Sequence, residues 1–386
     1  MNSNIIYLDN SATTKPHPEV LQTFLQVNEQ YYANPASIHE AGVEANALLM
    51  RAREQIAGIV GTEAKHVIFT AGGTESNNFA IFGTAQANTH KGKHILTTKI
   101  EHPSVLEAVK RLAQEGFEVE YLAVNEVGII SLDKLREKVR PDTILVSIMH
   151  VNNEMGAIQP IAEAAAIIHA QSRALFHVDA VQSFGKIPVR FHDEHGPDLI
   201  TISGHKIHAL KGSGALLLRK KLTVAPFLVG GGQEFGLRSG TVAVPQAVAL
   251  AKAARMAIEA MPEKQLQFEK WSNDLHAFLR KFGRDIHLLS SEAGAAHIVS
   301  FSVNGLKGEV LINALQQHGI IVSTSSACSS KQTTTSHVVE ALNVIPSFKK
   351  GVLRVSFGAH TTDAHIEQFK KVFTVIMRDL KGENKE

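Results

Sequence analysis

The sequence predicts an α/β protein with a seven-stranded, mostly parallel sheet and a smaller α+β domain. Three observations lead to this fold class. From about Ala45 to Leu218, short apolar or β-branched runs alternate with stretches of helical period, as in parallel strands joined by helices. Beyond Met261 the strand candidates are fewer and belong to a second unit. The length of 386 residues also exceeds one ordinary domain.

Seven segments of the first region are short and rich in apolar or β-branched residues, as buried strands are. They are HVIFT (66–70), KHILTT (93–98), FEVEYLAV (117–124), TILVSIMH (143–150), LFHVDAV (175–181), DLITIS (198–203) and GALLLR (214–219). Helices are expected between them. In residues 104–115, for example, Val105, Ala108, Val109 and Leu112 form an apolar stripe at helical spacing.

A helical region over residues 242–261 is followed by Pro262 and a charged amphipathic stretch, and we expect it to bridge two domains. The elements expected beyond it are the strands HIVSFSV (297–303) and GVLRVSF (351–357) and the helices 309–317 and 363–380. We therefore assign residues 15–261 to a large α/β domain. Residues 1–14 and 262–386 are assigned to the small α+β domain.

Composition excludes several classes of protein. The formal charge of +2 comes from 39 basic and 37 acidic residues, a balance that indicates no direct nucleic-acid binding. A single cysteine forms no intramolecular disulfide and no multi-cysteine zinc site, which fits a reducing compartment. The start of the chain lacks the features of a signal peptide, and no apolar run approaches membrane-spanning length. We expect a cytoplasmic protein that does not bind membranes.

Lys206 directly follows the strand candidate 198–203 and precedes a glycine-rich exit. Its amine is expected at the carboxyl edge of the sheet, where open α/β sheets bind ligands. A desolvated lysine near other cations loses its proton more easily and can form a Schiff base. The ordinary alternative is a solvated lysine in a turn. Ser203 and Lys206 also match S-x-x-K of penicillin-binding enzymes, but the companion motifs S-D-N and K-T-G do not occur in the sequence.

Two further stretches should end on the same edge of the sheet. Gly72, Gly73 and Thr74 lie between a strand and a helix, where backbone N–H groups and the helix dipole favour a phosphate, although an ordinary turn has the same composition. Asp179 ends an apolar strand, where a carboxylate needs a cationic partner. Pyridoxal phosphate needs an amine, an anion site and a carboxylate for its ring nitrogen. The joint occurrence of these residues predicts pyridoxal 5'-phosphate as the cofactor.

Cys328 is the only cysteine and lies among small hydroxylated residues in STSSACSSKQTTTS (323–336). A structural cysteine is usually buried among apolar side chains. This composition instead predicts a polar, mobile loop that carries a thiol.

The sequence resembles the cysteine desulfurases of the NifS/IscS type, which are members of the class-V aminotransferase family. The resemblance rests on ten short motifs that occur in order over nearly the whole chain. They are YLDNSATT (7–14), NPASIHEAG (34–42), GGTESNN (72–78), EHPSV (101–105), MHVNNEMG (149–156), HVDAVQ (177–182), SGHK (203–206), GLRSGT (236–241), SSAC (325–328) and LRVSFG (353–358). Such a series of motifs does not arise by chance.

This resemblance implies a pyridoxal-phosphate-dependent transferase of fold type I, similar to aspartate aminotransferase. Lys206 would be the Schiff-base lysine, Asp179 the partner of the ring nitrogen, and His102 would stack on the ring and shuttle protons. The other residues expected to bind the cofactor are Gly73, Thr74, Asn153, Gln182, Ser203 and His205, together with Thr241 of the neighbouring subunit. A shared site of this kind implies a homodimer.

The resemblance also assigns the substrate site. Asn34, Asn153 and Arg354 would bind the carboxylate of L-cysteine, and the planar fork of an arginine suits a carboxylate. A surface cation is the ordinary alternative for Arg354, and a helix-capping residue is the ordinary alternative for His102. Lys206 would act as the base, and Cys328 would attack the substrate sulfur to give L-alanine and a persulfide.

The persulfide would then pass to an acceptor protein for a thio-cofactor, for tRNA thiolation or for iron–sulfur assembly. Two other functions remain open. One is amino transfer or elimination on another amino acid, in which Cys328 would be dispensable. The other is a catalytically idle relative that binds and activates a sulfur-transfer partner.

The chain departs from the family pattern after the lysine. In IHALKGSG (207–214), His208, Ala209 and Leu210 replace an aromatic-Gly-Pro sequence, which leaves roles for His208 and Lys211 open. The spacing from the cysteine to LRVSFG resembles the long-loop, type I branch. We expect no C-terminal extension for an iron–sulfur scaffold. HDEH (192–195) has the spacing of a metal site but lacks a nearby third ligand, so we predict no metal.

Overall fold

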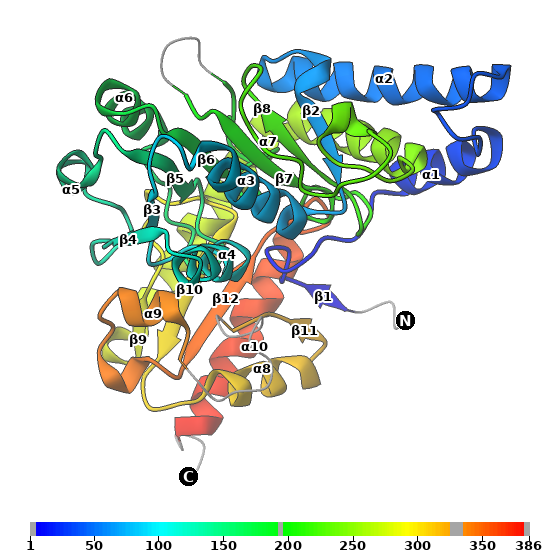
Figure 1. Ribbon diagram of the computed structural model, residues 1–386. Helices are drawn as coiled ribbons and strands as arrows, with labels where there is room; N and C mark the ends of the chain where they lie inside the picture. The colour runs from blue at the N-terminus through cyan, green and yellow to red at the C-terminus, as the bar shows by residue number, and fades with distance from the viewer. Residues whose placement is uncertain (1–4, 192–195, 325–334, 382–386) are drawn as a thin grey trace.

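The computed structural model describes residues 5–191, 196–324 and 335–381. Its centre is a seven-stranded sheet in the order β2-β8-β7-β6-β5-β3-β4 (Figure 1). The strands are β2 (Val67–Thr70), β3 (His94–Thr98), β4 (Glu118–Leu122), β5 (Thr143–Met149), β6 (Leu175–Asp179), β7 (Leu199–Ser203) and β8 (Gly214–Leu218). All seven predicted strands are confirmed. Only β8 runs against its neighbours, so the sheet is mostly parallel, as expected.

Helices cover both faces of this sheet. The first six helices of the chain are α1 (Pro18–Gln30), α2 (Glu40–Val60), α3 (Gly73–Asn88), α4 (Pro103–Gln114), α5 (Leu132–Lys138) and α6 (Ile161–Gln171). Apolar residues of α3 and α4, such as Ile81 and Val109, pack on one side of the sheet. Residues of α2 and α6, such as Ile56 and Ile168, belong to the core on the other side. α4 thus buries the apolar stripe that its sequence predicts.

α7 (Val244–Arg280) connects two hydrophobic cores. Its first half places Ala249, Leu250 and Ala254 in the core of the large sheet. Its second half places Trp271 and Leu275 in a separate core. The helix continues through Pro262, although a proline removes a backbone hydrogen bond and clashes with the preceding turn. Burial of both flanking halves compensates for this local cost.

The second core is built on the antiparallel sheet β12-β10-β9, and a short parallel pair, β1 and β11, lies beside it. The remaining elements are β1 (Ile6–Tyr7), β9 (Ile286–Leu288), β10 (Ile298–Val303), α8 (Gly308–Gln317), β11 (Ile320–Ile321), β12 (Val352–Ser356) and α10 (Asp363–Lys381), together with α9 (His337–Ala341), which packs in a smaller separate cluster. β1 pairs with β11, so the first described residues join the C-terminal part of the chain. The exact domain boundaries given above stay a prediction.

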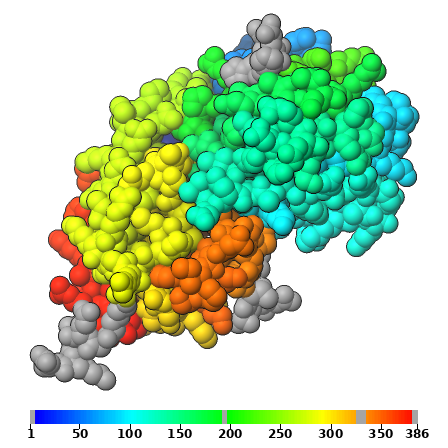
Figure 2. Space-filling model, turned by 90° about the vertical axis from the view of Figure 1, so that its left-hand side faces the viewer, coloured from blue at the N-terminus to red at the C-terminus, as the bar shows by residue number. Residues whose placement is uncertain are grey.

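The space-filling view shows an elongated body (Figure 2). The green and cyan part of the chain forms one end, and the yellow, orange and red part forms the other. Within the described ranges, no helix is both long enough and apolar enough to cross a membrane.

Phe373 lies at the centre of the second core. Its ring centroid is 5.5 Å from that of Phe301 and 5.6 Å from those of Phe282 and Phe369. We expect Phe373→Ala to lower the free energy of unfolding by about 3–5 kcal/mol, because it removes a buried ring and leaves a cavity. Val375→Ala is the control on the same helix, where the side chain is 48% exposed, and should change stability by less than about 0.5 kcal/mol. Calorimetric unfolding of both variants checks this, and similar losses would contradict it.

Candidate functional site

A cavity of about 860 Å³ lies at the carboxyl ends of strands of the large sheet. It brings together residues that the sequence predicted from separate motifs. They are Gly73, Thr74, His102, Asn153, Asp179, Gln182, Ser203, His205, Lys206 and Arg354. This is the edge where open α/β sheets bind ligands.

Lys206 reaches this cavity from a single turn of 3-10 helix, Gly204–Lys206, that directly follows β7. Its Nζ donates hydrogen bonds to the backbone carbonyls of Ala12, at 2.8 Å, and Ser11. The N-terminal segment therefore holds the amine at the wall of the cavity rather than in bulk water. The solvated-lysine alternative does not fit this position.

The start of α3 forms an anion site in the same cavity. The first N–H groups of a helix have no partners within the helix, and the N-cap Gly72 has no side chain to accept from them. The hydroxyl of Ser203 is buried and has no hydrogen-bond partner in the described part of the chain. Burial and the nearby Lys206 ammonium lower the pKa of His205 to about 4. A phosphate would use the free donors and raise the pKa of this imidazole.

A chain of hydrogen bonds links Asp179 to His102. Asn77 Nδ2 donates to Asp179 Oδ2 at 2.7 Å and to Ser104 Oγ at 2.9 Å. Ser104 Oγ lies 2.8 Å from His102 Nδ1, which also accepts from the backbone N–H of Ser104 at 3.1 Å. Nδ1 is therefore an acceptor, and the proton of the neutral ring is on Nε2. Burial lowers the pKa of His102, which favours this neutral form.

These residues fit pyridoxal phosphate. The amine of Lys206 can bind its aldehyde, the α3 N-terminus with Ser203 can hold its phosphate, and Asp179 can pair with its ring nitrogen. The unpartnered buried hydroxyl of Ser203 is the observation that tests the fit, because a buried polar atom without a partner is costly.

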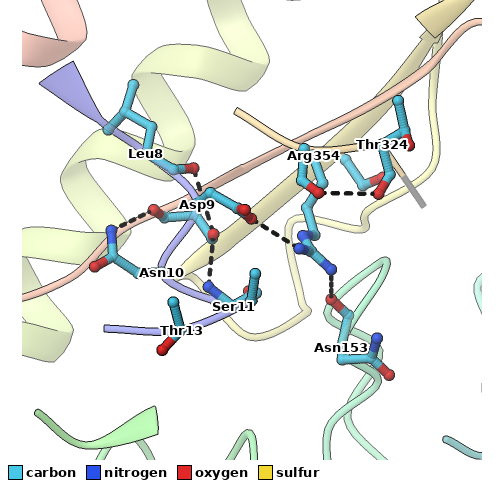
Figure 3. Close-up of polar contacts among 12 residues, drawn as sticks. Leu8, Asp9, Asn10, Ser11, Thr13, Asn153, Thr324 and Arg354 are labelled. Atoms are coloured by element: carbon cyan, nitrogen blue, oxygen red, sulfur yellow. Dashed lines mark hydrogen bonds and ion pairs between the residues drawn. The ribbon is translucent and has the colours of Figure 1, made fainter. Parts of the chain in front are cut away.

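Arg354 lies on β12 and lines the cavity, with its side chain 5% exposed and pointing toward Asp9 and Asn153 (Figure 3). Its Nη2 donates to Asp9 Oδ1 at 2.8 Å, and its Nη1 donates to the backbone carbonyl of Asn153 at 2.8 Å. Nε is buried without a hydrogen bond in the described chain. A guanidinium carries five N–H groups, so Arg354 keeps donors for an incoming carboxylate.

Two buried carboxyl groups belong to direct sequence neighbours of residues that line the cavity: Glu101 precedes His102, and Glu154 follows Asn153. Burial raises the pKa of Glu101 to about 8, and its Oε1 accepts from Thr98 Oγ1 at 2.7 Å and from the Met149 N–H at 2.9 Å. Burial raises the pKa of Glu154 to about 7, and its Oε2 accepts from Ser336 Oγ at 2.6 Å. Both groups are therefore largely or partly neutral at neutral pH.

Two predicted site residues lie elsewhere. Asn34 is exposed, and its Oδ1 accepts from the N–H of Ala36 at 2.9 Å. Thr241 is also exposed, and neither residue lines the cavity described here. Cys328 and the HDEH stretch (192–195) lie outside the described residues. The roles given to these residues stay predictions.

The residues after Lys206 have a structural explanation. His208 has a left-handed backbone with φ 62°, and its N–H donates to Thr14 Oγ1 at 2.8 Å. Its ring Nδ1 donates to the Lys15 carbonyl at 2.8 Å, and its Nε2 accepts from the Ala359 N–H at 3.2 Å. His208 thus connects the lysine turn to both ends of the chain. Lys211 lines the cavity.

Several residues of the site were not assigned a role from the sequence. Asp9, Asn77, Glu101 and Ser104 all lie inside the motifs quoted above, so the motifs themselves were the available signal. The carbonyls that accept from Lys206 belong to the backbone of Ser11 and Ala12, and side-chain chemistry gives no sign of them.

The chain belongs to the class-V aminotransferase family, which matches residues 6–369 and consists of pyridoxal-phosphate enzymes. The cysteine desulfurase IscS of Dictyoglomus turgidum is 39% identical over 380 residues, which cover 97% of this chain and 95% of that protein. IscS of Klebsiella pneumoniae is 41% identical over 368 residues, covering 94% and 90%. A solved NifS-like protein has a TM-score of 0.90 at 35% identity, covering 97% of this chain and 99% of that one. The predicted family, fold class and cofactor are confirmed.

The space around Gly73 allows a test of the anion site. A Cβ at this position would lie 2.9 Å from Val181 Cγ2 and 3.5 Å from Ser203 Cβ. We expect Gly73→Ala to weaken binding of pyridoxal phosphate by about tenfold, because a methyl group would crowd the phosphate donors. Gly58→Ala, where nothing lies within 4 Å of the added Cβ, is the matched control. Titration of the apoenzyme, followed by the cofactor's absorption, measures both affinities; equal values would disprove the assignment.

Proposed function

We propose that this protein is a pyridoxal-phosphate-dependent cysteine desulfurase, which converts L-cysteine to L-alanine and transfers the sulfur to Cys328. The observation that carries the proposal is the single cavity that contains Lys206, the α3 anion site and Arg354. The names of the similar proteins, cysteine desulfurase IscS, support the same reaction.

The cofactor, when bound, supplies an electron sink for the negative charge that develops at the substrate Cα. The residues of the chain position the substrate and the groups that transfer protons. Arg354 is already oriented by Asp9 and Asn153, so its remaining donors can fix the substrate carboxylate with little loss of side-chain entropy. Lys206 Nζ lies at the same wall as the cofactor site and takes the Cα proton. The neutral His102 presents an Nε2 proton.

The sulfur step needs no oxidant. The thiolate of Cys328 attacks the substrate sulfur, an S–S bond forms and the C–S bond breaks. The electron pair of the broken bond stays with the substrate carbon, which takes up a proton and becomes the methyl group of alanine. The products are L-alanine and a persulfide on Cys328.

The described residues on both sides of the cysteine segment lie near the cavity. Ser323 exchanges backbone hydrogen bonds with Arg354, at 3.2 and 2.7 Å. On the other side, His337 Nε2 donates to the carbonyl of Glu101, the neighbour of His102, at 2.9 Å. These two anchors support a role for the intervening cysteine in this site. An acceptor protein that carries sulfur toward a thio-cofactor, thiolated tRNA or an iron–sulfur centre would take up the persulfide.

Cys328→Ser tests the sulfur step. We expect this variant to bind the cofactor normally but to form neither alanine nor sulfide from cysteine. Lys206→Ala is the companion variant and should also lose turnover, with a changed absorption spectrum of the cofactor. Alanine and sulfide are measured after incubation with cysteine, and mass spectrometry locates the extra sulfur in the wild type. Full activity of Cys328→Ser, or consumption of cysteine without alanine, would point to another class-V reaction.

We also propose that the protein is a homodimer, with Thr241 reaching the cofactor phosphate of the neighbouring subunit. Large apolar side chains are exposed on α1, on the connection between α1 and α2, at the start of α2 and on the segment 228–235. They are Leu21 (43%), Leu25 (52%), Tyr32 (84%), Ile38 (98%), Val43 (57%), Val229 (87%) and Phe235 (52%). The Arg53 guanidinium of α2 lies 5.0 Å from the Phe235 ring, so these segments are neighbours. An exposed apolar surface of this kind is typical of a subunit interface.

Ile38→Glu should weaken this dimer, because a carboxylate would be buried in an apolar interface. We expect a monomeric fraction in light scattering, together with a cofactor affinity reduced by about tenfold if Thr241 serves the neighbouring site. Val127→Glu, at a position that is 40% exposed and outside this surface, should leave the dimer intact. A wild-type protein that is monomeric at micromolar concentration would rule the dimer out.

A further inference from the structure

A second cavity, of about 300 Å³, lies next to the candidate active site. The two cavities have only Lys206 in common among their lining residues. We call this second space the hinge cavity, because its walls come from both halves of α7 and from the segments around Lys186 and Phe357. Nothing in the reaction proposed above uses it.

One side of the hinge cavity is apolar. Ala253, Met256, Ala257 and Ala260 line it from the first half of α7, and Phe268 lines it from the second half. An engineered apolar cavity of about 150 Å³ is large enough to hold benzene. The hinge cavity therefore has room for an aromatic ring or a short branched chain together with a polar group.

The other side is cationic. Lys186, Lys206 and Lys264 line the cavity, and none of its described lining residues is an aspartate or a glutamate. His17 and His208 are the remaining titratable groups on its walls. His17 Nδ1 accepts from the Glu19 N–H, and both ring nitrogens of His208 are occupied by the Lys15 carbonyl and the Ala359 N–H. The histidines are therefore fixed, and the lysines define the charge.

Lys186 is poorly compensated in this position. Its Nζ donates a long hydrogen bond of 3.5 Å to Gln182 Oε1. Burial and the neighbouring Lys206 ammonium lower the pKa of Lys186 to about 7. An ammonium group in such surroundings gains from an anion that is brought beside it, since no carboxylate of the cavity wall is available.

We propose that the hinge cavity binds a small carboxylate with an apolar body, of about the size of benzoate. The carboxylate pairs with Lys186, and the body packs against Met256, Ala257 and Ala260. Because the walls come from both halves of α7, such a ligand contacts both hydrophobic cores at once. The proposal does not depend on which reaction the neighbouring active site performs.

Calorimetric titration of the holoenzyme with benzoate tests this. We expect one saturable site per chain, and benzyl alcohol, which has the same body without the charge, should bind about tenfold more weakly or worse. Equal binding of the two compounds, or no saturable binding of benzoate, would overturn the proposal.

Three variants locate the site. Lys186→Gln removes the cation, and Ala260→Phe fills the apolar side from an exposed position, so each should weaken benzoate binding by about tenfold. Lys110→Gln, on the exposed face of α4, is the control and should bind as the wild type does. Lys211→Gln should also bind normally, because Lys211 lines only the candidate active site. Loss of binding in Lys211→Gln with normal binding in Lys186→Gln would place benzoate in the active site and refute the proposal.

Proton uptake gives an independent signal. Burial is the main cause that lowers the pKa of Lys186, so part of its population is neutral at pH 7, and an anion that protonates it causes proton uptake. Titrations in buffers of different ionisation enthalpy measure this uptake. It should occur in the wild type and in Lys110→Gln and disappear in Lys186→Gln. Uptake that persists in Lys186→Gln would assign the proton to another group and contradict the pairing.

Discussion

The buried ion pair between Arg354 and Asp9 is the interaction on which the rest of the site depends. It joins β12 to the N-terminal segment, and the second arm of the guanidinium holds the loop of Asn153. The same N-terminal segment then offers its backbone carbonyls to Lys206. One side chain therefore fixes β12 and the Asn153 loop relative to the segment that holds Lys206. Removing one partner of such a pair would leave a buried charge without compensation, at a cost of about 3–5 kcal/mol.

The protonation states around the cavity fit its anionic ligands. Burial raises the pKa of Glu101 and of Glu154, so neither contributes a full negative charge at neutral pH. Burial also raises the pKa of Asp9, but the Arg354 guanidinium opposes this and keeps the carboxylate paired. Lys206, Lys211 and Arg354 line the cavity beside the carboxylates Glu75 and Asp179, and such cations suit a phosphate and an amino-acid carboxylate. The charge around the cavity therefore depends on which of its groups are buried more than on the overall amino-acid composition, since the whole chain is nearly neutral.

Much of the fold and of the cofactor site follows from local sequence. The buried strands are almost continuously apolar, and the residues after each strand meet at one edge because the strands are parallel. Helices α1 and α2 were harder to predict, because the exposed apolar residues Leu21, Leu25 and Val43 lie outside the buried face and weaken the helical period of the apolar pattern. β9 is too short to give a periodic signal. Pro262 indicates a helix end locally, yet tertiary packing on both sides keeps α7 continuous. The hydrogen bonds from Lys206 to backbone carbonyls have no signature in side-chain sequence.

The pairing of β1 with β11 has a consequence for how the molecule is made. Leu8 belongs to the same core as Phe357 and Phe373, so it can be buried only after those later residues have been synthesised. The large sheet, whose strands end at Leu218, can assemble while the ribosome is still adding the C-terminal part. Until this core has formed, the carbonyls of Ser11 and Ala12 have no fixed place beside Lys206. The position of this amine therefore depends on the second core as well as on the large sheet.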